Sequence, residues 1–403
     1  MCEYLESLRW GSLSLQKSEN SEDMADFSSA NTQFALELLR ILNDTNPDKN
    51  IFISPLSITS ALAMVYLGAR GNTATQMSKA LCLRPNTDIH KDIQLFLSDI
   101  NNPSAPYQLK LANRLYGEKT YSFLQEYLDA TQKFYYAALE AVDFKGAPEK
   151  TVLQINHWVE EQTNGKIKNI LQPGAVDSQT RLALVNSIYF KGQWHSVFFE
   201  SNTKEKPFKI NQHESKLVQM MYQDQKFPYS YVPEYNLQIL ELPYESGDLS
   251  MVILLPEEAK NGSNPLQKLE KELTIEKINE WTKKEKMKSY KDIYVYLPKF
   301  KLEESYDLIP PLRSLGITDV FNDHLADLSG INGQKDLFVS TVAHKTFINV
   351  DEIGTEAAAS TAMVSKVLCY GGSENFNADH PFLFFIRHNK SKTILFLGRV
   401  SSP

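Results

Sequence analysis

The sequence is poor in cysteine, and its cysteines lack the close spacing that marks a metal site or a dense disulfide framework. Only Cys2, Cys82 and Cys369 occur among 403 residues. The sequence contains no run of eighteen apolar residues, the length that would predict a transmembrane helix. The start of the chain carries charges and lacks the apolar stretch of a signal peptide. We therefore predict a cytoplasmic protein without metal or other cofactor and without a membrane partner, and leave open its release by a route that needs no signal peptide.

Sequence motifs of common enzymes are also missing. There is no G-x-S-x-G turn, no phosphate-binding glycine loop and no dinucleotide fingerprint, and His213-Glu214 lacks the second histidine of a zinc-protease motif. A catalytic triad assembled from distant residues stays open, because triads are recognised by geometry. The net charge is −7 with both signs interspersed, so nucleic acid is not an expected partner. The sequence favours a protein that is not an enzyme.

The composition predicts one large folded domain. Hydrophobic residues make up 42% and charged residues 23% of the chain, which supplies enough apolar material for a core. Residues 1–23 are polar and without apolar periodicity, so we expect a flexible N-terminal extension followed by a domain over residues 24–403. Met24 could serve as an alternative start of the chain.

Helical patterns fill much of the first half of the sequence and strand patterns much of the second. Small polar residues at 28–32 predict the cap of a helix whose apolar stripe includes Phe34 and Leu38. Ser54-Pro55 predicts the start of a buried helix that stops at Gly68. A continuous apolar run at 181–190 predicts a strand covered on both faces. Further strands are predicted at 237–242, 249–255, 293–297, 344–350, 382–387 and 393–399. The fold class is α+β.

A run of small side chains after the strand pattern at 344–350 is unusual. Residues 352–362 read EIGTEAAASTA, which composition alone would assign to a flexible loop or a weak helix. Together with NIFISPLSI at 50–58, NSIYFKG at 186–192 and the terminal DHPFLF and FLGR segments, the run resembles the serpin family. These segments occur in the order typical of that family, and the resemblance covers residues 24–403. The chain is most similar to the ovalbumin-like intracellular branch.

The resemblance implies a fold of three β-sheets and about nine helices with an exposed reactive loop at about residues 352–376. It also implies a suicide-substrate inhibitor of serine proteases. A protease acylated by the loop would be trapped when the cleaved loop enters the main sheet as a new strand. The alternative is a non-inhibitory serpin that acts in binding, storage or as a chaperone. Small hinge side chains favour inhibition.

Individual residues take roles only through this resemblance. Leu368–Cys369 is the expected reactive bond, with Val367 as an adjoining subsite. Lys366 offers a competing site of cleavage. Leu368 suits an apolar primary pocket, so the expected partners are proteases of the chymotrypsin, chymase, cathepsin G or elastase type, held in a covalent complex by a monomeric inhibitor. The remaining residues form a hinge (Glu352, Gly354, Thr355, Glu356, Ala357, Ala358, Ala359, Ser360, Thr361, Ala362), a shutter (Ser54, Ser57, Asn186, His344) and a breach (Trp194, and Lys299 as ion partner of Glu352).

Insertion of the hinge as a strand requires a regular alternation of side chains. Thr355, Ala357, Ala359, Thr361 and Met363 would then share the covered face, with Glu356 on the other face, where its charge need not be buried. Gly354 would supply backbone freedom. We expect Thr355 to be exposed in the intact protein and to enter the sheet only after cleavage.

Overall fold

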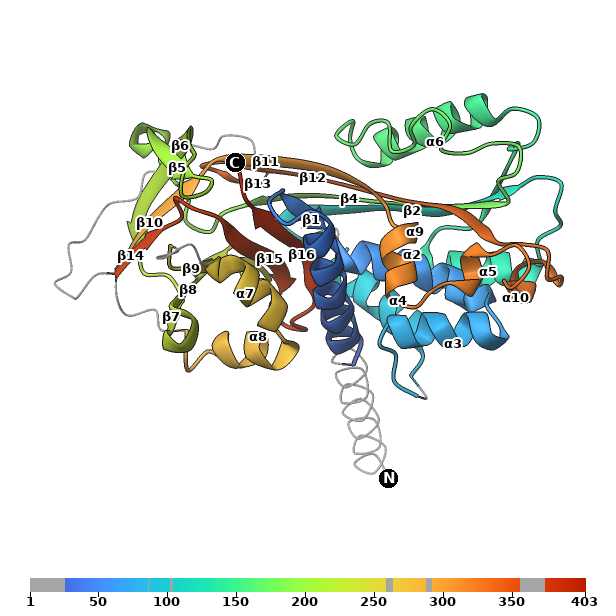
Figure 1. Ribbon diagram of the computed structural model, residues 1–403, viewed down its shortest axis with the longest axis horizontal. Coiled ribbons are helices and arrows are strands. Elements are labelled where there is room, and N and C mark those ends of the chain that lie inside the picture. The colour runs from blue at the N-terminus through green and yellow to red at the C-terminus, as the bar shows by residue number, and fades with distance from the viewer. Residues whose placement is uncertain (1–25, 86, 102–103, 259–263, 288–291, 356–373) are drawn as a thin grey trace, which may run out of the picture.

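The computed structural model describes residues 26–85, 87–101, 104–258, 264–287, 292–355 and 374–403. The described residues form three β-sheets with helices packed around them, as the fold prediction states (Figure 1). Residues 26–45 are helical. The other α-helices are α2 (Pro55–Gly68), α3 (Gly71–Ala80), α4 (Ile89–Ile100), α5 (Gln125–Tyr135), α6 (Pro148–Gln162), α7 (Pro265–Glu272), α8 (Ile275–Trp281), α9 (Ile309–Ser314) and α10 (Ser329–Asn332). Three short 3-10 helices are η1 (Glu200–Asn202), η2 (Pro233–Tyr235) and η3 (Asp319–Phe321).

The main sheet runs along the length of the molecule and has six strands. Their order in space is β11 (Phe300–Asp307), β12 (Val339–Val350), β13 (Gly354–Thr355), β4 (Leu182–Gln193), β2 (Tyr107–Glu118) and β3 (Glu140–Val142). Strands β12 and β4 are parallel and pair directly over most of their length, from Val339↔Leu182 to Phe347↔Tyr189. Beyond that point β13 lies between them. The predicted strand at 344–350 is thus the second half of a longer strand.

Two further sheets complete the fold. The core sheet is antiparallel and has the order β1 (Ile51–Ile53), β16 (Ile394–Val400), β15 (Phe382–His388), β9 (Leu249–Pro256), β8 (Leu237–Pro243) and β7 (Tyr229–Val232). The four-stranded sheet has the order β14 (Glu374–Asn377), β10 (Ile293–Pro298), β6 (Ser215–Gln225) and β5 (Lys204–Lys209). Every residue of β9, β15 and β16 is buried, which explains their largely apolar sequences.

The strand predicted to be covered on both faces is confirmed as β4. One face of β4, with Leu184, joins the large apolar core beneath the sheet. The other face, with Val185, packs with Ile155 of α6 in a separate, smaller cluster. Figure 1 shows α6 on one side of the main sheet and α2 with its neighbours on the opposite side. The continuous apolar run in the sequence follows from this two-sided burial.

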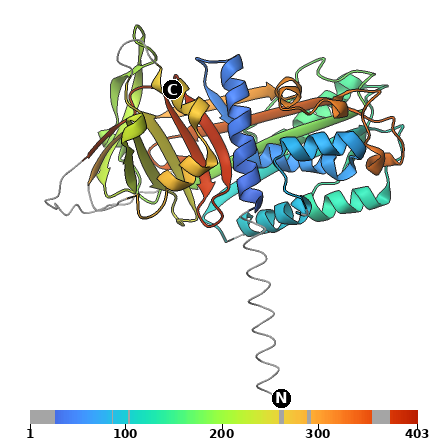
Figure 2. The same ribbon diagram turned by 60° about the horizontal axis from the view of Figure 1, so that its bottom comes forward.

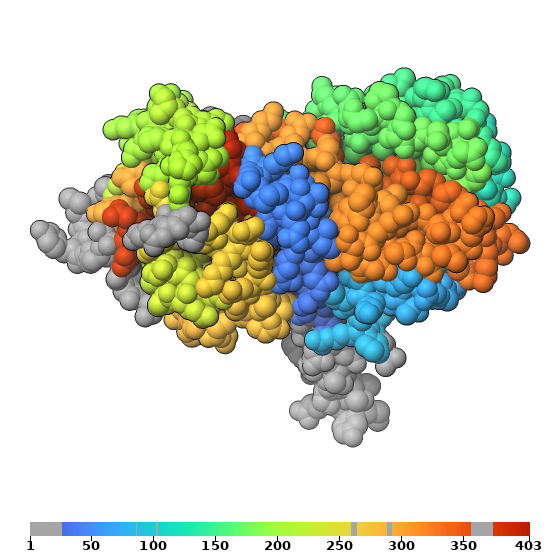
Figure 3. Space-filling view, viewed as in Figure 1, coloured from blue at the N-terminus to red at the C-terminus, as the bar shows by residue number. Residues whose placement is uncertain are grey.

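The predicted cap of the first helix is wrong. Residues 28–32 lie inside the helix, because the chain is already helical at residue 26. Ser28, Asn31 and Thr32 are buried, and Asn31 is fully enclosed, donates to the carbonyl of Ile394 and accepts from Thr59. Asn31 therefore joins the helix to the core sheet. Figures 2 and 3 show this helix crossing the middle of the molecule, between α7–α8 and the half that carries α9.

Helix α2 begins and ends where the sequence predicts. The Ser54 side chain accepts from the amide of Ser57, and Pro55 occupies the first turn. At Gly68 an added Cβ would lie 2.3 Å from the Ile331 side chain, so the last turn has no room for a larger residue. Almost the whole helix is buried beneath the main sheet, and its N-terminus lies at the polar centre of that sheet.

Candidate functional site

A row of polar side chains crosses the centre of the main sheet. Strand register aligns Asn113 of β2 with Asn186 of β4, Asn186 with His344 of β12, and His344 with Tyr306 of β11. The Asn186 amide donates to Asn113 Oδ1 at 2.7 Å, and Asn186 Oδ1 bonds to His344 Nδ1. These groups lie in the otherwise apolar interior, where each unmade hydrogen bond would cost about 1–3 kcal/mol. The network therefore holds β2, β4 and β12 together.

The tautomer of His344 follows from its two partners. The Ser54 amide donates to Nε2 at 3.2 Å, so Nε2 is the acceptor and Nδ1 carries the proton donated to Asn186. Burial disfavours the charged ring and lowers the pKa of His344 to about 3. The imidazole is consequently neutral across the physiological range.

Ser54 and Ser57 connect this row to the helix below it and to the core sheet. The Ser54 hydroxyl donates to the Leu395 carbonyl of β16 at 2.6 Å. The Ser57 hydroxyl donates to Asn113 at 2.9 Å, and the Ser57 carbonyl accepts from Asn186 at 2.6 Å. The four predicted shutter residues therefore form one buried network. Sequence analysis missed its fifth member, Asn113, although a lone asparagine among the alternating leucines of 109–115 was an available signal.

The end of the main sheet where β13 enters is built around Trp194. Its indole stacks on Tyr244 at 4.7 Å and donates to the Asp351 carbonyl at 3.1 Å. The Trp194 amide donates to the Ile353 carbonyl at 2.9 Å. Tyr244 in turn shares a hydrogen bond of 2.9 Å with the Thr355 hydroxyl. This cluster binds the segment before β13 firmly to the end of β4.

Glu352 and Lys299 form the ion pair that the resemblance implies. Lys299 Nζ lies 2.8 Å from Glu352 Oε2, and the Thr203 hydroxyl donates to Oε1 at 2.7 Å. Burial alone would raise the pKa of Glu352, but the bonds from Lys299 and Thr203 outweigh it and hold that pKa below its usual value. The carboxylate stays charged and fixes the turn before β13.

Gly354 is required by close packing as much as by backbone freedom. An added Cβ would lie 2.2 Å from the Gly192 carbonyl oxygen and 2.8 Å from the Gln193 Cα. Its φ of +157° also falls in a region that side chains rarely adopt. Only glycine lets β13 approach β4 this closely.

The expectation that Thr355 is exposed in the intact protein is wrong. Thr355 is completely buried, pairs with Val350 of β12 and Gly192 of β4, and directs its hydroxyl toward Tyr244. At the other end of the predicted reactive loop of 352–376, residues 374–376 belong to β14. The remaining hinge residues Glu356, Ala357, Ala358, Ala359, Ser360, Thr361 and Ala362, and the reactive-bond residues Val367, Leu368 and Cys369, lie outside the described residues.

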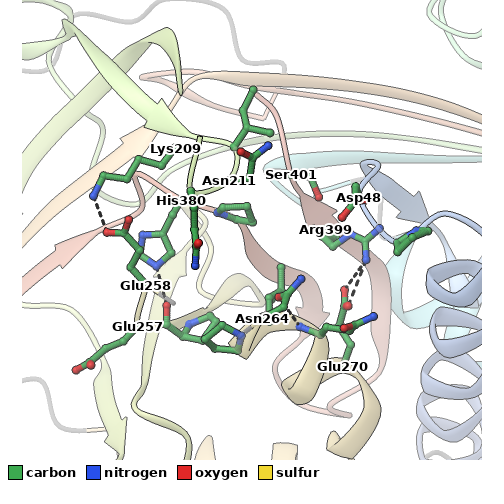
Figure 4. A pocket seen from close by; sticks show the side chains of 18 of the residues that line it. Asp48, Lys209, Asn211, Glu257, Glu258, Asn264, Glu270, His380, Arg399 and Ser401 are labelled. Atoms are coloured by element: carbon green, nitrogen blue, oxygen red, sulfur yellow. Dashed lines mark hydrogen bonds and ion pairs between the residues drawn. The ribbon is translucent and has the colours of Figure 1, made fainter. Parts of the chain in front are cut away.

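A cavity of about 360 Å³ lies away from this site, between β5, the start of α7 and the segment before β15 (Figure 4). The buried ion pair of Arg399 with Glu270, at 3.1 Å, lines it. Arg399 also donates to the carbonyls of Asn46 and Lys49. Its donors are thus used to hold β16 against the end of the first helix and α7.

The arrangement of sheets and site agrees with known proteins. The family model "Serpin (serine protease inhibitor)" matches residues 29–403. The chain belongs to the serpin family. Leukocyte elastase inhibitor of Equus caballus is 55% identical over 94% of this chain and all of its own length. The crystal structure of uncleaved ovalbumin, a serpin 40% identical, has a TM-score of 0.84 over 94% of this chain and all of that one. A loop-inserted structure of a cleaved ovalbumin mutant reaches the same TM-score at 38% identity, with the same 94% and 100% coverage.

Membership of the serpin family explains why the polar row and β13 lie in one sheet. In a serpin the main sheet accepts the cleaved loop as an additional strand. Here β12 and β4 are adjacent at the polar row and separated at β13. The described part of the chain contains no helix long and apolar enough to cross a membrane. It also contains no group of three or more His, Cys, Asp or Glu side chains arranged to bind a metal ion.

Proposed function

We propose that this serpin inhibits serine proteases as a suicide substrate with Leu368–Cys369 as the reactive bond. The protease serine oxygen attacks the Leu368 carbonyl carbon, the bond to the Cys369 nitrogen breaks, and that nitrogen leaves as an amine after taking up a proton. Leu368 remains as an ester on the protease. Insertion of the residues after Thr355 into the main sheet then carries the protease away before water hydrolyses the ester.

The observation that supports this proposal best is the position of β13. Its two residues already lie between β12 and β4 and lead directly into the run of small side chains from 356. From Thr355 to Leu368 the extended chain would span about 45 Å, comparable with the length of the 12-residue strand β4. The non-inhibitory alternative is not favoured, because curated relatives with about half of their residues identical are named leukocyte elastase inhibitors.

The expected targets are proteases with an apolar primary pocket, of the chymotrypsin, chymase, cathepsin G or elastase type. An apolar Leu368 suits such a pocket, whereas an acidic pocket would prefer Lys366. The proposed inhibitor acts as a monomer in the cytoplasm. The free thiol of Cys82 is compatible with a reducing compartment.

The test is incubation with cathepsin G, chymotrypsin, neutrophil elastase and, for comparison, trypsin. We expect a complex that survives denaturing electrophoresis with the first three, and a released peptide whose mass begins at Cys369. Leu368→Asp should slow the association by about 100-fold or more, because a carboxylate is poorly accommodated in an apolar pocket. Lys366→Gln is the matched control and should leave the rate unchanged. A peptide that begins at Val367 would instead assign the cleavage to Lys366.

A further inference from the structure

The gap between β12 and β4 extends further than β13 itself fills. Direct pairing of the two strands ends at Phe347↔Tyr189, and Thr355 of β13 pairs with both of them, at Val350 and Gly192. Two rows in between, Ile348 with Phe190 and Asn349 with Lys191, have no direct strand pairing. The next residues after Thr355 can therefore enter the sheet without breaking existing hydrogen bonds between β12 and β4.

The register of β13 determines which residue enters which row. Because Thr355 pairs with Val350 and Gly192, an antiparallel continuation places residue 356 between Asn349 and Lys191. The preceding side chain, Thr355, points toward the core and Tyr244, so an inserted residue 356 would point to the opposite face. Helix α6 packs on another part of that face, whereas the row of Asn349 and Lys191 lies near the end of the sheet where β13 enters.

The same row carries unpaired positive charge. Lys191 is half-buried, and its ammonium group has no ion pair or hydrogen bond within the described part of the chain. Lys301, opposite Asn349 on β11, is exposed. Its ammonium lies 5.2 Å from the Phe347 ring centroid, its one contact of this kind among the described residues. Both side chains lie on the outer face, since Phe190 and Leu302 next to them point into the core.

We propose that Lys191, assisted by Lys301, receives the carboxylate of Glu356 as the first ion pair of loop insertion. The inference rests on the proposed inhibitory function. Directly opposed residues of neighbouring strands have Cβ atoms about 5 Å apart, and opposite charges in such positions attract. The occupant of this part of the sheet is thus the segment that begins with Glu356. The pair favours insertion over hydrolysis by holding the first inserted residue in register.

The experiment measures how many inhibitor molecules are cleaved for each one that traps cathepsin G. Lys191→Gln should raise this ratio about two- to fivefold at low salt, the range expected for one cross-strand charge pair. Glu356→Gln should have the same effect, and the double variant should be no worse than either single one. Because salt screens exposed charges, 0.5 M NaCl should raise the wild-type ratio but leave that of Lys191→Gln unchanged. Lys110→Gln, which removes an exposed charge of the same face on β2, is the control and should resemble wild type.

Additive effects of Lys191→Gln and Glu356→Gln, or a ratio for Lys191→Gln equal to wild type, would overturn this inference while leaving the inhibitory function intact. A wild-type protein that traps none of the proteases would instead contradict the proposed function. In that case the loop of the wild type and of Lys191→Gln is cut with an unrelated protease, and the thermal transitions of the cut and intact proteins are measured. Clipped Lys191→Gln should melt below clipped wild type while the intact proteins melt together; coincident clipped transitions overturn the ion pair as well.

Discussion

His344 shows how one buried residue sets a dependence of stability on pH. Its neutral ring accepts from the Ser54 amide through Nε2 and donates to Asn186 through Nδ1, and protonation of Nε2 removes the acceptor for the Ser54 amide. An unfolded histidine has a pKa near 6.5, whereas burial lowers that of His344 to about 3. Between these values the unfolded state binds a proton that the folded state does not. The contribution of His344 to stability is therefore complete above pH 6.5 and is lost as the pH falls toward 3.

We predict that His344→Gln weakens this pH dependence. Between pH 6.5 and 4.5 the native state of the wild type should lose about 2–3 kcal/mol of stability through His344 alone. Glutamine retains a donor and an acceptor but does not titrate. Urea unfolding measured over this range should show a shallower slope for the variant. His90, whose pKa burial lowers to about 4, contributes similarly in both proteins, so identical slopes would show that His344 is not the group responsible.

Among the small residues of 352–362, Thr361 is the one that the register of β13 would bring to the polar row at the centre of the main sheet. Continuing β13 along β12 and β4 places it between His344 and Asn186. In that register Thr361 would face the core as Thr355 does, and Thr355 already bonds to the Tyr244 hydroxyl. A hydroxyl at 361 can replace the direct bond between His344 and Asn186 when β12 and β4 separate.

Thr361→Val should therefore destabilise the loop-clipped protein and spare the intact one. Loss of the hydroxyl would leave buried polar groups of the row without a partner, at a cost of about 1–3 kcal/mol. The clipped variant should unfold at lower denaturant concentration than clipped wild type. Thr361→Ser, which keeps the hydroxyl, is the matched control. A clipped valine variant as stable as clipped wild type would contradict a hydrogen bond from residue 361.

At the scale of elements, β13 is the strand that sequence reasoning placed incorrectly. The alternation of Thr355 and Glu356 predicts which faces they would occupy, but not that Thr355 already lies in the sheet. That depends on how far β12 and β4 diverge, which is set by Trp194, Tyr244 and the close approach at Gly354. By contrast, α2 and β4 were predictable because their local signals, Ser54-Pro55 and a run buried on both faces, agree with their tertiary surroundings.

The buried position of Thr355 makes it unsuitable as a test of insertion, because a large side chain there would disturb the intact fold. Ala359 is better placed, since the register of β13 brings it to the core face between Ile188 and Thr346, both fully buried. The target protease should cleave the Ala359→Arg variant at the wild-type rate, but it should then be released from the variant in active form. Ser373→Arg adds the same charge on the segment that does not enter the sheet and should still inhibit. Denaturant-stable complex at wild-type yield from Ala359→Arg would contradict strand insertion.

At the scale of the whole molecule, two residues of β13 already lie between β12 and β4, and the rest of this boundary is directly paired and must separate to accept a complete strand. The loop begins between β12 and β4 and returns to the four-stranded sheet at β14. While both ends are held, the covalent chain prevents further insertion. Cutting the loop releases the end that follows Thr355. We therefore predict that the intact protein is kinetically trapped above a more stable, loop-inserted form.

Clipping the chain near Leu368 should therefore raise the thermal transition substantially. The inserted segment would gain hydrogen bonds to both β12 and β4 along most of the 12-residue length of β4. With a net gain of about 0.5–1.5 kcal/mol for each bond, the transition should rise by about 10 °C or more. The measurement compares calorimetric scans of intact and clipped protein, with Ala359→Arg as the control whose clipped form should gain much less. Calorimetry separates folding from inhibition because no target protease is present.

If intact and clipped wild type melt together, the cut loop does not enter the sheet. The separation of β12 and β4 at β13 would then be a fixed feature of the fold, and the protein would be a non-inhibitory serpin.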